Sequence, residues 1–261
     1  MTAPVLAAKG LVKRFRGVEA VRGVDLTVLA GEAVALIGPN GAGKTTCFNM
    51  LGGQLRPDAG RVAFEGADVT GKLPRELWQL GVGRSFQITQ AFVSMTVREN
   101  VQVALHAKAR RLWRFAEPLG SHFKDEADAI LERVGMREQA ERSCAVLAYG
   151  DLKRIELAIA LAGSPKLMLM DEPTAGMAPQ ERAQLMQLAA GIARARGIGI
   201  LFTEHDMDAV FAHADRIIVL VRGKIITAGT REAIRADPQV RQAYLGGETL
   251  AQLAEQRARP A

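Results

Sequence analysis

Short apolar runs, separated by glycines and by amphipathic stretches, alternate along most of this chain. Residues 5–64 show a pattern typical of short strands. Within them, the run at 33–37 (Ala-Val-Ala-Leu-Ile) is continuous, apolar and rich in β-forming residues, which is typical of a buried strand. Glycines indicate turns between the predicted strands at Gly17, Gly23, Gly31 and Gly60.

The middle of the chain, residues 91–160, has a helical pattern instead. Residues 125–134 place apolar side chains at helical spacing, and Gly135 follows where such a helix would stop. From residue 166 onward strands and helices alternate. We predict strands at 166–170, 198–203 and 217–221, and helices at 179–196 and 206–212. Alternation of this kind predicts an α/β protein with helices packed on a parallel sheet, here interrupted by a helical insertion.

Composition is that of an ordinary globular protein, with 48% apolar and 24% charged residues among 261. Because no apolar run approaches the ~18 residues of a membrane span, and no secretory pattern opens the chain, we expect a soluble cytoplasmic protein. Cys47 and Cys144 show no metal-ligand spacing and indicate no disulfide framework. The net charge of +6 suits an anionic membrane surface, acidic partner loops, nucleic acid or simple solubility, and does not distinguish them.

The most informative motif is Gly-Pro-Asn-Gly-Ala-Gly-Lys-Thr at 38–45, which fits the phosphate-loop pattern Gly-x-x-x-x-Gly-Lys-[Ser/Thr]. It lies between a predicted strand and a predicted helix, the context in which this motif binds nucleotides. Its glycines let backbone N–H groups converge on phosphate oxygens, and the helix N-terminus adds partial positive charge. Lys44 would reach the β- and γ-phosphates, and Thr45 would offer its hydroxyl to Mg²⁺.

Two carboxylates follow a second buried strand. The apolar run 167–170 leads directly into Asp171 and Glu172. Because ligands of an open parallel sheet lie at the carboxyl ends of its strands, we expect both acids near the bound phosphates. Asp171 would face Mg²⁺, directly or through water, and Glu172 would orient and polarise the attacking water.

Weaker signals come from His205 and Gln87. His205 follows the predicted strand at 198–203. At this place it could hydrogen-bond the γ-phosphate, or it could be an ordinary structural histidine, and the residue alone does not favour either interpretation. Gln87 lies where the core gives way to the helical insertion, and its amide could coordinate Mg²⁺ and bind water. On its own it is a weak indication.

The order of these motifs resembles the ATP-binding subunits of ABC transporters over almost the whole chain. Residues 38–45 match that family's Walker A loop and 167–171 its Walker B strand. The segment Leu-Ala-Tyr-Gly-Asp at 147–151, called the signature segment below, stands where the family has Leu-Ser-Gly-Gly-Gln. In the family two such subunits face each other head to tail, and each ATP lies between one subunit's Walker A loop and the other's signature.

The resemblance implies ATP and Mg²⁺ as ligands. It implies that Glu172 is the catalytic carboxylate, with His205 as the switch histidine and Gln87 as the glutamine of the Q-loop. Phe15 would stack on adenine. The other implied nucleotide contacts are Gly38, Asn40, Gly41, Ala42, Gly43, Lys44, Thr45, Thr46, Gly150 and Asp151. The implied metal ligands are Thr45, Gln87 and Asp171.

The same resemblance implies a P-loop NTPase (RecA-like) core with an N-terminal antiparallel β subdomain and an inserted α-helical subdomain. We expect the core and β subdomain at 1–90 and 158–230, the helical signature subdomain at 91–157, and a C-terminal helical tail at 231–261.

Two residues depart from the family pattern. Ala148 replaces the signature serine, so that hydroxyl is lost, although Gly150 and the N–H groups opening the next helix can still contact a γ-phosphate. Ala178 replaces the aspartate of the loop at 174–178, called the D-loop below, and removes the carboxylate that the family uses for communication across the dimer.

The chain further resembles the longer ATPase of branched-chain amino-acid importers. The features that carry this resemblance are the form of the signature segment, the Phe-Gln junction at 86–87, the long basic middle segment and the ending at 237–246. This implies a peripheral protein at the cytoplasmic face of the inner membrane that hydrolyses ATP to drive import. Its implied partners are two membrane permease subunits, a second ATP-binding subunit (a paralogue or a second copy) and a periplasmic or extracellular substrate-binding protein, without nucleic acid.

Alternatives stay open. Related importers of urea, short amides or aromatic acids share much of the pattern, and a soluble ABC ATPase acting on DNA or ribosomes would also suit the basic charge. A small-molecule kinase shares the phosphate loop, but the signature segment speaks against it. The basic and aromatic stretch at 106–115 indicates either a solvated helix face or a surface that docks on another subunit or the membrane interface.

Overall fold

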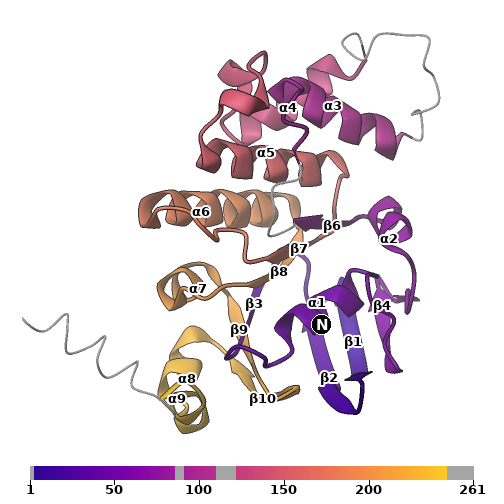
Figure 1. Ribbon diagram of the computed structural model, residues 1–261, viewed down its shortest axis with the longest axis vertical. Coiled ribbons are helices and arrows are strands. Elements are labelled where there is room, and N and C mark those ends of the chain that lie inside the picture. Colours follow the sequence, from indigo (N-terminus) through magenta and orange to yellow (C-terminus); the bar gives the residue numbers. More distant parts are fainter. Residues whose placement is uncertain (1–2, 86–90, 110–121, 246–261) are drawn as a thin grey trace, which may run out of the picture.

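The computed structural model describes residues 3–85, 91–109 and 122–245, and it contains two β-sheets with helices around them (Figure 1). The first sheet is antiparallel, in the order β2-β1-β4-β5. Its strands are β1 Leu6–Phe15, β2 Val18–Val28, β4 Ala59–Phe64 and β5 Ala67–Asp68.

The second sheet has the order β10-β9-β3-β8-β7-β6 and is parallel except for β10 at its edge. Its strands are β3 Ala33–Ile37, β6 Val82–Ser85, β7 Leu167–Asp171, β8 Gly199–Thr203, β9 Arg216–Val221 and β10 Lys224–Gly229. Every residue of β3, β7 and β8 is buried, which explains their continuous apolar runs.

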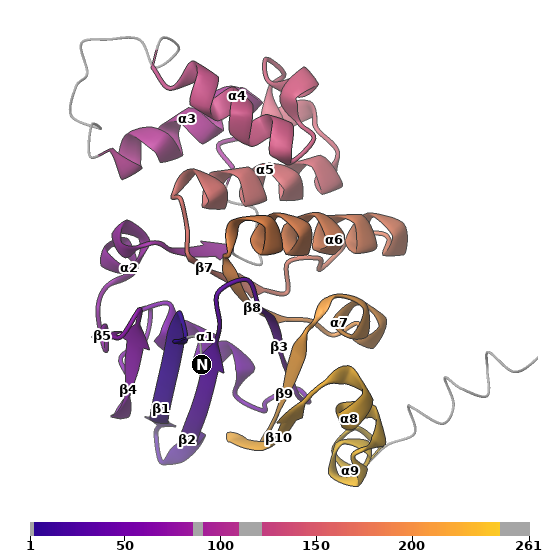
Figure 2. The ribbon, with the colours of Figure 1, turned by 180° about the vertical axis from the view of Figure 1, so that it is seen from behind.

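Helices cover both faces of this sheet. They are α1 Lys44–Leu51, α2 Pro74–Leu80, α3 Val97–Lys108, α4 Lys124–Arg133, α5 Tyr149–Ala162, α6 Pro179–Arg196, α7 Met207–His213, α8 Arg231–Ala236 and α9 Pro238–Leu245, with short 3₁₀ turns η2 Arg137–Gln139 and η3 Cys144–Val146. Both views place α3, α4 and α5 beyond α6, away from the sheet (Figures 1 and 2). No helix in the described parts of the chain has the length and apolar character needed to cross a bilayer.

The two faces of the central sheet belong to different apolar cores. Along β3, Ala33, Ala35 and Ile37 pack with the helical side, whereas Val34 and Leu36 pack with α1 and the antiparallel sheet. This alternation follows from the two-residue period of a strand, whose successive side chains point to opposite faces. The centre of this sheet is therefore sandwiched between two apolar cores, whereas the edge strand β10 is partly exposed.

Most elements predicted from the sequence are confirmed. Helix α6 spans the predicted residues and β3 matches its predicted run. β8 and β9 differ from prediction by one residue at one end, and β7 and α7 are shifted by one residue at both ends. The expectation of short strands before residue 64 was wrong, because β1 has 10 residues and β2 has 11. Gly23 lies inside β2 at a register shift, with φ +75°, and forms a bulge instead of a turn. Gly60 likewise lies within β4.

Candidate functional site

The phosphate loop joins the end of β3 to the start of α1 and packs closely against one strand from each sheet. A Cβ atom on Gly38 would lie 2.0 Å from the carbonyl oxygen of Leu220 on β9. On Gly43 it would lie 2.5 Å from the carbonyl oxygen of Ala20 on β2. Gly43 also adopts φ +104°, a conformation that side chains rarely tolerate. Both glycines are therefore required by the packing of the loop itself.

Lys44 opens α1, and its side chain turns back over the loop. Its Nζ donates hydrogen bonds to the carbonyl oxygens of Gly38 at 2.7 Å and Pro39 at 3.3 Å. Burial lowers the pKa of Lys44, while the carboxylates of Glu172 and Asp171 act in the opposite direction. An anionic phosphate beside this ammonium group would favour its charged form, as a phosphate-binding role requires.

Thr203, the last residue of β8, holds the two acids at the end of β7. Its hydroxyl donates to Asp171 Oδ1 at 2.7 Å and accepts the backbone N–H of Glu172 at 3.0 Å. The same N–H also reaches the Thr203 carbonyl oxygen at 3.2 Å. Thr203 is fully buried, so its hydroxyl holds the Asp171 carboxylate and the Glu172 backbone from the interior of the protein. The sequence analysis missed this role, because only the pairing of β7 with β8 brings the residues together.

His205 lies just beyond β8 and meets Glu172. Its Nε2 is 2.7 Å from Glu172 Oε1, so the contact joins the residues that follow β7 and β8. The Glu172 side chain is 20% exposed and that of His205 is 53% exposed, so this pair faces the solvent while Asp171 stays buried. Glu172 has φ +49°, which turns the chain sharply after the strand.

Lys44, Glu172 and His205 line one cavity of about 230 Å³ at the carboxyl ends of β3, β7 and β8, whereas Gly38, Asp171 and Thr203 are not part of its lining. Its lining residues are Ala20, Asn40, Gly41, Ala42, Gly43, Lys44, Thr45, Thr46, Glu172 and His205. Sequence motifs that lie far apart along the chain thus converge at one edge of the parallel sheet, where ligands of such sheets bind.

Thr45 and Asp171 have the chemistry expected for magnesium ligands. Thr45 is exposed at the start of α1, and Asp171 keeps its Oδ2 clear of the hydrogen bond that Thr203 donates to Oδ1. Hydroxyl and carboxylate oxygens suit Mg²⁺, which takes few protein ligands and completes its shell with water and substrate phosphates. Arg84 on β6 is a further residue that the sequence analysis missed, with its Nη2 3.8 Å from Asp171 Oδ2.

Other predicted site residues lie elsewhere. Phe15 ends β1, is 44% exposed and does not line the cavity; the Nζ of Lys13 lies 5.8 Å from its ring centroid. Gly150 and Asp151 lie in the first turn of α5, likewise outside the cavity lining. Gln87 lies outside the described residues.

A phosphate loop followed by a buried acid, a partly exposed glutamate and a histidine at the ends of neighbouring parallel strands defines an ATPase of the P-loop class. The family model for ABC transporters matches residues 21–175, and the chain belongs to that family as an ATP-hydrolysing cassette. A second model, described as branched-chain amino acid ATP-binding cassette transporter, matches residues 224–249.

Named relatives are similar over nearly their full length. The chain is 40% identical to the high-affinity branched-chain amino acid transport ATP-binding protein LivG of Salmonella typhimurium, covering 94% of this chain and 99% of LivG. It is 37% identical to BraF of Pseudomonas aeruginosa, a protein of the same description, with the same coverage.

Solved structures agree with this assignment. The ADP conformation of an ATP-binding cassette of an ABC transporter matches with a TM-score of 0.83 and 34% identity, covering 95% of this chain and 100% of that one. A dimeric post-hydrolysis cassette bound to ADP and phosphate matches with a TM-score of 0.72 and 26% identity, covering 86% of this chain and 98% of that one.

Proposed function

We propose that this chain is the ATP-hydrolysing subunit of an importer for branched-chain or related hydrophobic amino acids. The observation that carries its ATPase role is the convergence of Lys44, Glu172 and His205 on one cavity. Support for the cargo comes from the names of LivG and BraF and from the C-terminal match at 224–249. An importer of urea, short amides or aromatic acids is the alternative.

In the proposed mechanism the loop N–H groups and Lys44 bind the phosphates of ATP, and Phe15 stacks on the adenine. Thr45, Asp171 and Gln87 would hold Mg²⁺, which neutralises charge on the phosphate oxygens. Glu172 orients a water molecule for in-line attack on the γ-phosphorus, and the negative charge that develops is stabilised by Lys44. The bond with His205 keeps the Glu172 carboxylate aimed along the strand ends.

The site is completed by a second subunit in this proposal. Gly150, Asp151 and the N–H groups that open α5 would contact the γ-phosphate bound to the partner, because a helix N-terminus attracts anions. The dimeric relative bound to ADP and phosphate supports this arrangement. Since Ala148 lacks the hydroxyl of the family's signature serine, Gly150 and the backbone N–H groups would make that contact, whereas Ala178 provides no carboxylate for communication across the dimer.

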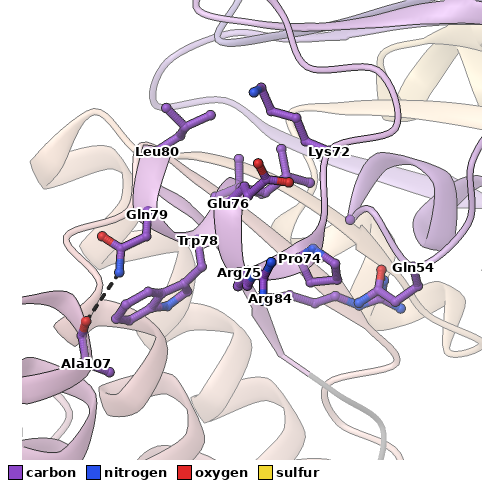
Figure 3. A pocket seen from close by; sticks show the side chains of 13 residues that line it. Gln54, Lys72, Pro74, Arg75, Glu76, Trp78, Gln79, Leu80, Arg84 and Ala107 are labelled. Atoms are coloured by element: carbon purple, nitrogen blue, oxygen red, sulfur yellow. Dashed lines mark hydrogen bonds between the residues drawn. The ribbon is translucent and has the colours of Figure 1, made fainter. Parts of the chain in front are cut away.

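A groove of about 850 Å³ offers a surface for a permease, where α1, α2, β6 and the end of α3 meet (Figure 3). Charged side chains in its lining are Lys72, Arg75, Arg84 and Glu76, of which Arg84 is already paired with Asp171. Leu80, 47% exposed, adds apolar surface, so the groove suits a cytoplasmic segment with apolar and acidic side chains. Because Gln79 Nε2 on α2 donates to the Ala107 carbonyl oxygen on α3 at 3.2 Å, an occupant would touch both the core and the insertion.

The rest of the assembly follows from this role. We propose two permease subunits, a second ATP-binding subunit and a substrate-binding protein as partners, with the chain held at the cytoplasmic face of the inner membrane. The division into a core at 1–90 and 158–230, a helical subdomain at 91–157 and a tail at 231–261 remains a proposal, and its boundary at 157 falls within α5.

Two substitutions test the catalytic assignment. Glu172→Gln should keep ATP binding, remove most turnover and trap the closed dimer, because the amide cannot polarise water as the carboxylate does. Lys44→Ala should weaken nucleotide binding. Phosphate release, nucleotide titration and size-exclusion chromatography with ATP measure these effects. If the Glu172→Gln variant hydrolyses ATP at the wild-type rate, the catalytic assignment of Glu172 is wrong. If Lys44→Ala binds nucleotide as tightly as the wild type, the assignment of the phosphate loop is wrong.

The transport role is tested by purifying the tagged chain from gently solubilised membranes of its own cell and identifying its partners by mass spectrometry. Two permeases and a second ATPase would support the importer, and the accompanying binding protein would indicate the cargo. Recovery only from the soluble fraction, with DNA or ribosomes attached, would instead support an ABC ATPase outside transport.

A further inference from the structure

Tyr149, in the signature segment, reaches the D-loop of its own chain. It is the first residue of α5, and its Oη donates a hydrogen bond to the Ala175 carbonyl oxygen at 3.1 Å. The contact joins two segments 26 residues apart in sequence, one at the start of α5 and the other between β7 and α6. A phenol is needed for it, because the glycine of the family signature at this position carries no donor.

The ring of Tyr149 is held from two sides. Gly176, at φ +80°, brings the D-loop backbone against it, since a Cβ built there would lie 3.5 Å from Tyr149 Cε1. On α5, Lys153 Nζ lies 5.5 Å from the ring centroid and forms a 3.0 Å ion pair with Glu156, and both charged residues are buried. A buried cation of this kind stays in place, so the tyrosine has a defined orientation although it is 42% exposed.

The D-loop leads directly to Glu172. The backbone N–H of Ala175, the residue that accepts the Tyr149 bond, donates to the Glu172 carbonyl oxygen at 3.1 Å. The Glu172 N–H is in turn fixed by Thr203. Two hydrogen bonds through one residue, Ala175, therefore connect the start of α5 with the backbone of Glu172, the residue whose carboxylate activates water in the proposed mechanism.

We propose that Tyr149 is a positioning residue that couples the two ATP sites of the dimer. When the start of α5 contacts the γ-phosphate held by the partner subunit, Tyr149 and Ala175 fix the backbone of this chain's own Glu172. The inference rests on the proposed function, in which the signature segment binds the partner's nucleotide. Because Ala178 provides no carboxylate in the D-loop, this hydrogen bond supplies a link between the sites within each chain.

The test is Tyr149→Phe in the transport complex purified from its own membranes. This variant keeps the ring against Gly176 and over Lys153, and it loses only the hydroxyl. The matched control is Thr27→Val, which removes an exposed hydroxyl from β2 on the antiparallel sheet. Hydrolysis rate against ATP concentration gives kcat, KM and the Hill coefficient, and equilibrium titration with a fluorescent ATP analogue gives the affinity.

We expect kcat of Tyr149→Phe to fall about three- to tenfold, as the loss of one hydrogen bond allows. The Hill coefficient should fall from above 1 toward 1, while nucleotide affinity and the melting temperature match those of Thr27→Val. A Tyr149→Phe variant as cooperative and as fast as the control would overturn the coupling role while leaving the proposed function intact. A wild-type complex that hydrolyses ATP without cooperativity would count against coupled sites and hence against the inference as well.

Discussion

Thr203→Val is the sharpest test of how the site is built, because it removes one buried hydroxyl and keeps the branched shape of the side chain. In the wild type that hydroxyl donates to Asp171 at 2.7 Å and accepts from the Glu172 N–H at 3.0 Å. The substitution leaves the Asp171 Oδ1 atom without this donor. The Glu172 N–H keeps its second acceptor, the Thr203 carbonyl oxygen at 3.2 Å.

The magnitude follows from these bonds. A hydrogen bond to a charged group contributes about 1.5–3 kcal/mol to the free energy of unfolding, and the bond to Asp171 is of this kind. We therefore expect Thr203→Val to lose about 2 kcal/mol, or about 4–8 °C in melting temperature for a chain of this size. A Glu172 carboxylate displaced by a fraction of an ångström should lower kcat about 10- to 100-fold.

The control is Thr203→Ser, which keeps the hydroxyl and loses one buried methyl group, at a cost of about 1 kcal/mol. Urea unfolding gives the stabilities, and phosphate release gives kcat for both variants. Thr203→Ser should retain most of its activity, whereas Thr203→Val should not. The reasoning is refuted if the valine variant is as stable as the wild type and equally active.

Three further predictions concern stability and reactivity. Burial raises the pKa of Glu204, so the folded state binds the Glu204 proton more tightly than the unfolded chain does, and the free energy of unfolding falls as pH rises through the folded pKa. Glu204→Gln should flatten this pH dependence in thermal unfolding measured from about pH 4 to about pH 7. An unchanged slope would contradict the assignment to Glu204. Gly191→Ala, inside α6 with open space around it, should stabilise by about 0.5–1 kcal/mol in urea unfolding, whereas Gly163→Ala should destabilise, because its Cβ would lie 2.9 Å from Trp78 Nε1. Burial raises the pKa of Cys47 to about 12, so a thiol reagent at neutral pH should label Cys47 only after unfolding, and labelling of the native protein would contradict the packing.

The sequence predicts the central sheet well because its strands are buried on both faces. Such strands appear as continuous apolar runs, and β3 and β7 are each followed directly by a functional motif. The antiparallel sheet is predicted poorly, because β1 and β2 are partly exposed and are interrupted by glycines inside the strands. Gly23 is the clearest example of a wrongly predicted turn. A glycine with positive φ occurs in bulges as well as in turns, so the residue type alone does not distinguish the two.

Lys44 and Glu172 were found because each belongs to a recognisable motif that follows a buried strand, β3 and β7 respectively. Thr203 and Arg84 were missed for a different reason. Each acts on Asp171 from a neighbouring strand, and which residue faces Asp171 depends on strand order and register. The amino-acid sequence of one chain does not indicate which strands pair or in which register. The contacts of Thr203 and Arg84 with Asp171 therefore became visible only in the structure.

The backbone of Glu172 explains why such neighbours matter. A non-glycine residue at φ +49° costs of order 1–3 kcal/mol, and the surrounding contacts must hold it there. Thr203 holds its N–H and Ala175 holds its carbonyl oxygen, while His205 binds the carboxylate. The strained turn lets two adjacent acids diverge, so that Asp171 stays buried while Glu172 faces the cavity. Loss of any one anchor should therefore reduce turnover before it affects nucleotide binding, because the phosphate loop on β3 does not depend on this turn.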